Sequence, residues 1–180
     1  MLLERYPKEV ELKGGKSVTL RPMVRTDEED LLDFFGGLTD LDRLYLRNDV
    51  SNPGVIRDWI KNIDYKRVFP ILACAGSRIV GNATLHRKPF GWMRHMGGVR
   101  IVISPDYRKH GLARLLANEI FDNAIDEELE KLTAEVVVDQ KTVLEVFSKL
   151  GFREEAVMRD YVLDAVGNRQ NLVIMTRDLI

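Results

Sequence analysis

The sequence has one cysteine, almost no net charge and no long apolar run, and each shortage excludes a class of protein. A single cysteine, Cys74, cannot form an internal disulfide or a zinc cluster built on cysteine. The three histidines lack the spacing of metal ligands, so we expect no metal. A formal net charge of −1 creates no overall basic field that would attract nucleic acid or an anionic membrane.

Segments that direct a chain to or through a membrane are also missing. No apolar stretch approaches transmembrane length, and the N-terminus lacks the charged-then-apolar pattern of a secretion signal. We therefore expect a cytoplasmic protein that binds neither membrane nor nucleic acid. The 180 residues suit one globular domain over 1–180, in which residues 1–21 form an N-terminal hairpin extension.

The order of periodic segments predicts a mixed α/β layout around one sheet. Gly14-Gly15 suits the tight turn of a hairpin between the first two strands. We expect strands at residues 10–13, 17–20, 70–75, 79–86, 99–103, 132–138, 153–163 and 171–177. We expect helices near residues 28–35, 40–46, 55–63, 111–129 and 141–150.

The segment 99–114 carries the strongest functional signal. A buried strand runs into a tight turn, and the turn opens a helix whose first N–H groups lack intrahelical partners and can point at an anion. Helix N-termini favour acidic side chains, yet no acid lies between Tyr107 and Asn118. The basic or titratable residues at this start are Arg108, Lys109, His110 and Arg114. This distribution predicts a bound polyanion, with a solvated basic turn as the alternative.

The identity of the polyanion follows from motifs. The P-loop pattern and Gly-x-Gly-x-x-Gly are both absent, which counts against an NTPase or a Rossmann dinucleotide site. Arg108-x-x-Gly111-x-Ala113 instead resembles the Arg/Gln-x-x-Gly-x-Gly/Ala signature of the GNAT superfamily of N-acetyltransferases. The segment 147–152, Phe-Ser-Lys-Leu-Gly-Phe, resembles that family's Tyr-x-Lys-x-Gly-Phe segment. The resemblance covers roughly residues 20–179.

The resemblance implies a fold and a reaction. The fold would be the α/β (α+β) GNAT fold: one mixed, mostly antiparallel sheet of about seven strands flanked by helices, with strands four and five splayed apart. Acetyl-CoA would donate the acetyl group, and a primary amine of a protein or a small molecule would attack the thioester directly. Three segments loosely resemble the bacterial protein-lysine acetyltransferase branch: Tyr6-Pro7, the hairpin that leads to Leu20-Arg21-Pro22, and residues 42–47. The oligomeric state stays open, with a homodimer as one option.

The resemblance also implies where the coenzyme would bind. Main-chain groups of the fourth family strand would pair with the pantetheine arm, as an added strand does. Amides from Lys109 to Arg114 would hold the pyrophosphate, and Arg108 or Lys109 could reach the 3′-phosphate. The expected coenzyme-binding residues are Ile101, Val102, Ile103, Arg108, Lys109, His110, Gly111, Leu112, Ala113, Arg114 and Phe147.

Three positions depart from the family pattern. Phe147 stands where a tyrosine commonly protonates the leaving thiolate, and a phenyl ring cannot donate a proton. Gln140 replaces a frequent asparagine, and Gly98 stands where related lysine acetyltransferases often carry a glutamate. The usual acid and the usual base are thus both missing. A catalytically silent acyl-CoA-binding module is therefore the alternative to an enzyme.

The remaining acid and base candidates each have a structural alternative. Asp139 lies near the expected splay but could cap the next helix, and Glu135 could face solvent. Tyr161 could replace the missing tyrosine or simply pack within its strand. We expect His86 and His95 to be surface residues. The loop 89–96 could contact the acceptor or be a packed surface loop.

Overall fold

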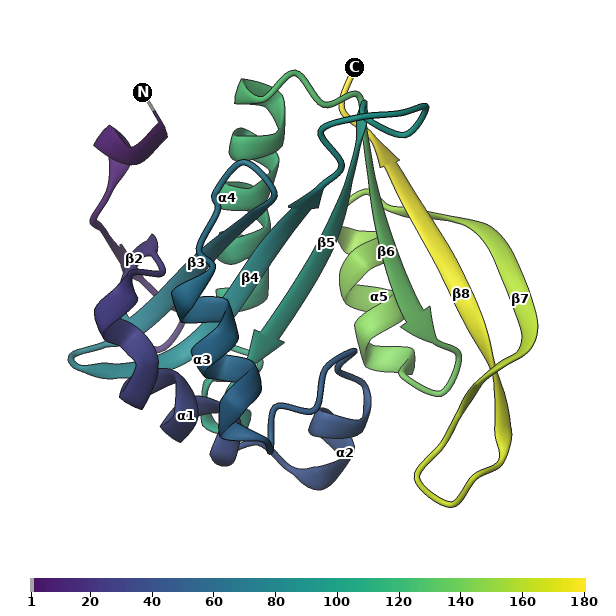
Figure 1. Cartoon of the computed structure of the whole chain (residues 1–180), viewed down its shortest axis with the longest axis horizontal. Coiled ribbons are helices and arrows are strands. Elements are labelled where there is room, and N and C mark those ends of the chain that lie inside the picture. The colour runs from purple at the N-terminus through teal and green to yellow at the C-terminus, as the bar shows by residue number, and fades with distance from the viewer. Residues whose placement is uncertain (1) are drawn as a thin grey trace.

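The computed structural model describes residues 2–180, which form one eight-stranded sheet covered by helices (Figure 1). The strands are β1 (Lys8–Glu11), β2 (Ser17–Pro22), β3 (Val68–Ala75), β4 (Arg78–Arg87), β5 (Met96–Ile103), β6 (Lys131–Val137), β7 (Arg153–Leu163) and β8 (Arg169–Asp178). The helices are α1 (Glu28–Gly36), α2 (Asp40–Leu44), α3 (Pro53–Lys61), α4 (Leu112–Asp126) and α5 (Lys141–Lys149), with 3-10 turns η1 (Leu2–Arg5), η2 (Arg25–Asp27) and η3 (Pro105–Tyr107).

The sheet has the order β1-β2-β3-β4-β5-β6-β8-β7. Every neighbouring pair is antiparallel except β5 and β6, which are parallel. The predicted mixed, mostly antiparallel sheet is confirmed, with the eight strands that the sequence pattern predicted where the family resemblance implied about seven. The N-terminal hairpin continues this sheet, because β2 pairs with β3 and its Val18 and Leu20 are buried in the core.

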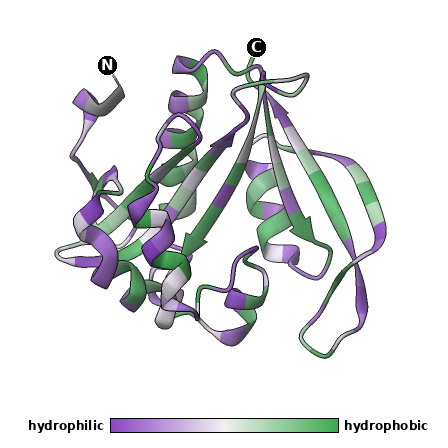
Figure 2. Cartoon of the chain, viewed as in Figure 1, coloured by the Kyte–Doolittle hydropathy of each residue, from purple (hydrophilic) through white to green (hydrophobic). Residues whose placement is uncertain are grey.

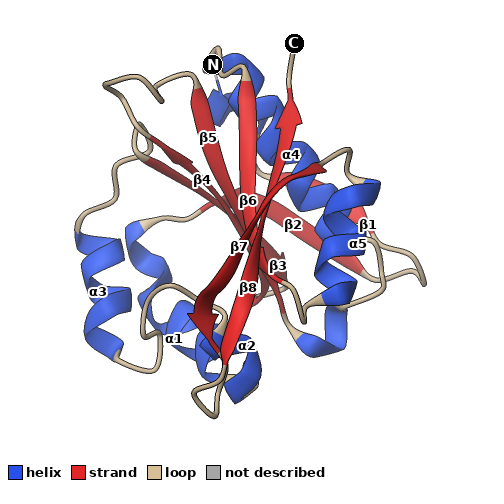
Figure 3. Ribbon diagram, turned by 90° about the vertical axis from the view of Figure 1, so that its right-hand side faces the viewer, coloured by secondary structure: helices blue, strands red, loops and turns tan. Residues whose placement is uncertain are grey.

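Helices cover both faces of the sheet, and each face has its own core (Figure 3). On one face, Leu112, Leu116 and Ile120 of α4 pack on buried side chains of the strands, together with Phe147 of α5. On the other face, α1 and α3 pack on Leu72 and neighbouring residues of β3 and β4. Each sheet face is therefore apolar over most of its area, which makes any polar group there conspicuous.

The two strands expected to splay are β5 and β6. They pair only from Met96 to Gly98 of β5, and beyond that point they diverge (Figure 1). Gly97 sits at the closed end, where a Cβ atom would lie 2.7 Å from Leu85, 2.9 Å from Leu129 and 3.0 Å from Leu132. Only glycine fits there without displacing these leucines, so the close packing fixes where the divergence begins.

Several expected boundaries shift for local reasons. Asp27 is the N-cap residue of α1 but does not cap it with its side chain, because its carboxylate accepts hydrogen bonds from Arg21 and from the main-chain N–H of Val24. Helix α3 begins at Pro53, two residues earlier than predicted, because the Asn52 side chain caps it. Helix α4 ends at Asp126 rather than near residue 129, and Glu128 then adopts a positive φ of 56°.

Candidate functional site

The loop between β5 and α4 is shaped by two residues in left-handed conformations. Lys109 has a φ of 66° and Gly111 a φ of 84°, and Gly111 is the N-cap of α4. A positive φ is strained for a residue with a side chain, which explains a glycine at the second position. The sharp turn directs the chain from the end of β5 straight into the helix.

The start of α4 presents main-chain donors without competing acid. The N–H groups of Leu112, Ala113 and Arg114 lie in the first turn, where a helix has no partner for them. That turn contains no acidic residue. The nearest atom to a Cβ built on Gly111 is the Lys13 Cγ, at 3.9 Å, so the backbone here is open to a ligand. The Leu112 side chain is buried in the core, so only its main chain can take part.

The turn of the N-terminal hairpin docks on this loop, a contact that the sequence did not reveal. The Lys13 N–H donates to the His110 carbonyl at 3.1 Å, and His110 Nδ1 lies 2.9 Å from the Lys13 carbonyl. Lys16 Nζ donates to the Asp106 carbonyl and lies 4.4 Å from the centre of the Tyr107 ring. The hairpin thus stabilises the loop and places two basic residues, Lys13 and Lys16, beside it.

Arg108 and Lys109 have different surroundings. Arg108 donates from Nε and Nη2 to the Ile103 carbonyl, both at 3.2 Å, and forms an ion pair with Asp42 at 2.8 Å. Burial alone would raise the pKa of Asp42, but the hydrogen bonds from Arg108 and Thr39 outweigh it and hold this pKa below its usual value. Within residues 2–180 no partner is found for the Lys109 side chain. Of the two, Lys109 is the one left to meet a phosphate.

The ladder between β4 and β5 determines which groups of β5 face β6. The Ser104 N–H donates to the Val80 carbonyl across β4 at 2.9 Å, and hydrogen-bonded pairs alternate along an antiparallel ladder. Residue 102 is therefore bonded to β4, whereas the main-chain groups of Ile101 and Ile103 point toward the divergence. Of the three residues expected to pair with pantetheine, Ile101 and Ile103 have the right orientation and Val102 does not.

The expected catalytic residues are not brought together. Asp139 is exposed and does not cap α5, because Gln140 is the N-cap residue and its Oε1 accepts from the Val137 N–H at 3.3 Å. Glu135 forms an ion pair with Arg47 at the surface of β6. Tyr161 lies on the edge strand β7 and is 62% exposed. No pair of these three residues is in contact.

Phe147 is a core residue rather than a lining residue. It is buried, and its ring centre lies 5.0 Å from that of Phe152 in an edge-to-face arrangement. A packed phenyl ring has no proton to give to a leaving thiolate. Position 147, where the family commonly has a tyrosine that protonates the thiolate, is therefore occupied by a packed side chain without a proton to donate.

Sequence reasoning missed a polar strip on the sheet face covered by α1–α3. The pairs His86–Gly98, Thr84–Arg100 and Asn82–Val102 lie side by side across β4 and β5, and Gly98 pairs in turn with Thr133 of β6. Val102 packs into the core on this face, so its strip neighbours face the same way. We define the polar strip by its members, which are Asn82, Thr84, His86, Arg100 and Thr133.

Figure 2 shows hydrophilic segments within the otherwise hydrophobic strands of the sheet, including β5. His86 is partly buried within β4, so the expectation of a surface histidine was wrong, and its Nε2 lies 2.9 Å from Thr84 Oγ1. Burial, then the charges of Arg100 and Arg47, lower the pKa of His86 to about 4. Burial, then the charge of Arg47, lowers the pKa of Arg100 to about 10. His86 is thus neutral near pH 7, and Arg100 is charged.

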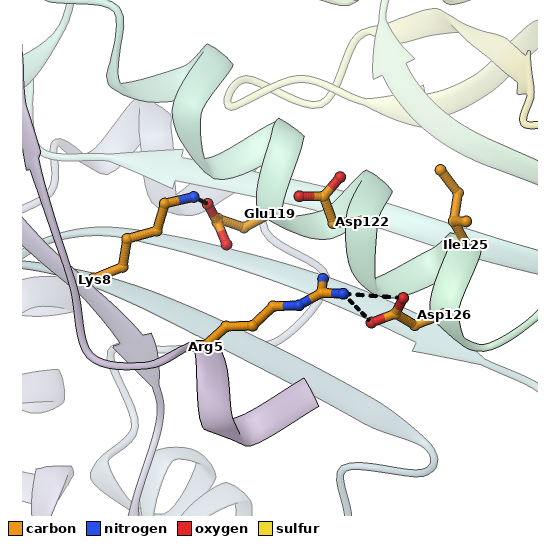
Figure 4. Close-up of a pocket in the computed structure, with 6 residues that line it drawn as sticks. All are labelled: Arg5, Lys8, Glu119, Asp122, Ile125 and Asp126. Atoms are coloured by element: carbon orange, nitrogen blue, oxygen red, sulfur yellow. Dashed lines mark hydrogen bonds and ion pairs between the residues drawn. The ribbon is translucent and has the colours of Figure 1, made fainter. Parts of the chain in front are cut away.

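A pocket lies elsewhere, on the outer side of α4 (Figure 4). Four of its five charged side chains form two ion pairs: Lys8 Nζ lies 2.6 Å from Glu119 Oε1, and Arg5 Nη2 lies 3.0 Å from Asp126 Oδ2. Glu119 is buried and also accepts from the Tyr6 hydroxyl at 2.9 Å. Burial and this carboxylate raise the pKa of Tyr6. The pocket contains no expected site residue, and we interpret its contacts as fastening the N-terminal segment to α4.

The described residues contain neither a metal-binding cluster nor a membrane-spanning helix. Over residues 2–180 no group of three or more histidine, cysteine, aspartate or glutamate side chains could hold a metal ion. In the same range no helix combines the length and the apolar character needed to cross a membrane.

Comparisons with known proteins agree on one family. The acetyltransferase (GNAT) family matches residues 33–152. The ribosomal protein bS18-alanine N-acetyltransferase of Escherichia coli is 29% identical over 75 residues, which are 42% of this chain and 50% of that protein. The chain therefore spans about half the length of the curated relatives it matches.

Solved structures share the fold at low identity. The GNAT domain of S. lividans PAT superposes with a TM-score of 0.79 at 17% identity, over 95% of this chain and 96% of that one. The structure of yncA from Salmonella typhimurium, which contains its cofactor acetyl-CoA, superposes with a TM-score of 0.76 at 16% identity, over 91% and 94% of the two chains. At these identities the likeness shows the fold alone.

Proposed function

Because the chain belongs to the acetyltransferase (GNAT) family, which takes its acetyl group from acetyl-CoA, we propose that it acetylates a primary amine through a complex of both substrates. One observation carries the proposal: the first turn of α4 offers free main-chain donors behind a left-handed Gly111 and contains no acidic residue. Such a helix start suits a diphosphate. We further propose that residues 1–180 form a single acetyltransferase domain.

The chain offers contacts for each part of the donor. Amides at residues 111–114 would hold the pyrophosphate, and Lys109 would meet the 3′-phosphate. The main-chain groups of Ile101 and the N–H of Ile103, whose carbonyl already accepts from Arg108, would pair with the pantetheine arm, which would lie between the diverging strands as an added strand does. This arrangement brings the thioester toward Gly98 and Thr133, where β5 and β6 part.

Positioning and water carry the chemistry in this proposal. Holding an amine and a thioester in line removes much of the ordering that a reaction in solution requires. Asp139, Glu135 and Tyr161 do not form a cluster, and the buried ring of Phe147 cannot donate a proton. A bound water would therefore take the proton from the ammonium form of the acceptor, and solvent would protonate the thiolate of CoA.

The identity of the amine is the finer part of the proposal. The matched ribosomal protein bS18-alanine N-acetyltransferases support a protein N-terminus, and the resemblance of residues 42–47 to the protein-lysine acetyltransferase branch supports a protein lysine. A small amine is the third candidate.

A second candidate function is an acyl-CoA-binding module without turnover. The buried Phe147 and the scattered acid and base candidates favour it. It shares the donor site with the enzyme, so CoA binding alone does not separate the two.

Thiol release from acetyl-CoA separates them. The wild-type chain would be incubated with labelled acetyl-CoA and a panel of small amines, peptides with free N-termini and lysine peptides. The proposal predicts thiol release and label transfer to at least one amine. Tight CoA binding with no transfer to any amine or cell extract would favour the binding module.

A further inference from the structure

The polar strip contains a charged side chain that nothing in the described chain neutralises. Arg100 lies inside β5, partly buried, on the sheet face whose core is formed with α1 and α3. Within residues 2–180 no hydrogen bond or ion pair to its guanidinium is found. A partly buried arginine without a carboxylate partner destabilises the fold, and an anionic ligand beside it would offset this cost.

The surrounding charges add to this excess of positive charge. Glu135 lies two residues beyond Thr133 on β6, as Arg100 lies two beyond Gly98 on β5, so the two face the same side across the divergence. Glu135, however, forms its ion pair with Arg47, which follows α2. With His86 neutral, the groups here are two arginines and one glutamate, which leaves one positive charge over.

A hydrogen-bond acceptor beside Arg100 is also unpartnered. Asn82 is 8% exposed, and its buried Oδ1 has no hydrogen-bond partner in the described part of the chain. Thr84 pairs with Arg100, and Asn82 lies two residues from Thr84 along β4. The side chains of Asn82 and Arg100 are therefore diagonal neighbours on one face. Protein atoms enclose this acceptor, so it adds to the polar character of the strip, and Arg100 is the member that can meet a ligand.

The segment after α1 covers this place from both sides. Asp42 of α2 is tied to Arg108 after β5, and Arg47 is tied to Glu135 of β6, so residues 42–47 bridge the diverging strands. Figure 1 shows α2 at the open end of the gap between β5 and β6. A covered site of this kind favours a small acceptor over the lysine of a folded protein.

We propose that the acceptor is a small amine bearing a carboxylate, with the carboxylate on Arg100 and the amine directed toward Gly98 and Thr133, where the thioester would lie. The inference rests on the proposed function, since it names the class of amine that the same site accepts. Arg47 would support the carboxylate from the side of α2. Arg100 is then the residue that determines specificity, rather than an acid or a base.

The test compares free amino acids with their carboxamides, which keep the amine and remove the negative charge. We expect kcat/KM for thiol release to favour the free acid by roughly tenfold to a hundredfold, as hydrogen bonds between charged groups do. The carboxamide has the less basic amine and is more often unprotonated at pH 7.5, so amine reactivity alone would favour it. A preference for the acid would therefore come from binding the carboxylate.

Variants locate the preference. Arg100→Gln should abolish it while leaving acetyl-CoA affinity unchanged, and Arg100→Lys should restore part of it. Arg25→Gln, an exposed arginine in η2, is the matched control and should keep the preference. Equal kcat/KM for acids and carboxamides, or an Arg100→Gln variant that slows both alike, would overturn the inference. Turnover only on peptides with an acidic residue would overturn the small acceptor.

Binding is read separately from turnover. Saturation-transfer NMR on the CoA-loaded chain should show contact with the free amino acids and a weaker signal with their carboxamides, and Arg100→Gln should remove the difference. If no amine releases thiol, the proposed enzyme fails, whereas this binding preference would still support the inference. If neither acid nor carboxamide binds better, the inference fails whether or not other amines are acetylated.

Discussion

At the scale of single residues, the site is defined by groups whose neighbours come from distant segments. His86 and Arg100 lie on different strands, and Arg47 arrives from the segment after α2. No local pattern in the sequence links these three residues. A lone histidine in a strand looks like a surface residue until the register places it opposite Gly98 and beside an unpaired arginine.

The first prediction concerns the titration of His86. Burial, reinforced by the positive charges of Arg100 and Arg47, should place its NMR titration midpoint near pH 4 rather than near the ordinary 6.5. Arg100→Gln should raise the midpoint because it removes a repulsive charge from beside the imidazole. A midpoint near 6.5 in the wild-type chain would show that the imidazole is solvated and not part of the strip.

The same shift makes stability depend on pH with a definite sign. Between about pH 6.5 and pH 4 the unfolded chain binds a proton on His86 that the folded chain does not. The free energy of unfolding should therefore fall as the pH is lowered through this window, by at most about 3 kcal/mol from this group. Urea unfolding of wild type and His86→Gln at pH 7 and pH 4.5 measures it, and the variant should lose less on acidification.

The second prediction concerns the acid and base candidates. Because Asp139, Glu135 and Tyr161 are scattered, replacing each one alone with Ala or Phe should reduce kcat by less than about a hundredfold, below the upper range of general acid–base catalysis. Thiol release at saturating acetyl-CoA gives the values. A drop of about a thousandfold in one variant, with acetyl-CoA affinity intact, would identify a dedicated catalytic residue and contradict the role of positioning.

At the scale of elements, the divergence of β5 and β6 depends on two adjacent glycines with different surroundings. A Cβ on Gly97 would lie within 3.0 Å of three leucines, whereas a Cβ on Gly98 would have only ordinary contacts, at 3.7 Å from His86 and 3.9 Å from Thr133. Neither position has a positive φ. The pair therefore separates crowding from backbone strain.

The third prediction uses this pair. Gly97→Ala should lower the free energy of unfolding by about 1–3 kcal/mol, the usual cost of overpacking a core. Gly98→Ala should change it by less than about 1 kcal/mol and serves as the matched control. Urea unfolding at pH 7 compares them, and equal stabilities would mean that the closed end is loosely packed.

The elements also show how far sequence reasoning reaches. Periodicity and turn residues predicted the main helices and strands and the helix start at residue 111, because those signals are local. The docking of Lys13 and Lys16 on the loop at residues 106–110 was not predictable, since it depends on how β1 and β2 join the sheet. The main-chain hydrogen bonding of Val102 to β4 was also not predictable, because the side-chain pattern does not indicate which main-chain groups bond to a neighbouring strand.

At the scale of the whole molecule, the charge of the chain is nearly balanced, so binding of an anionic coenzyme depends on local placement. The α4 N-terminus, Lys109 and the hairpin lysines gather on one side of the diverging strands, and the polar strip lies on the sheet face under α1–α3. Donor and acceptor would thus approach the parting strands from different sides. Because the two sites lie on different sides of these strands, both substrates could bind at the same time.

The most direct test of the account is calorimetric titration of CoA into the wild-type chain and two glycine variants. Gly111 and Gly167 have φ values of 84° and 88°, and neither is crowded, so valine strains both backbones alike. We predict that wild type and Gly167→Val bind CoA with the same affinity, and that Gly111→Val binds at least about tenfold more weakly because the amides no longer converge on the diphosphate. No uptake by the folded wild-type chain, or unchanged affinity in Gly111→Val, would contradict the account.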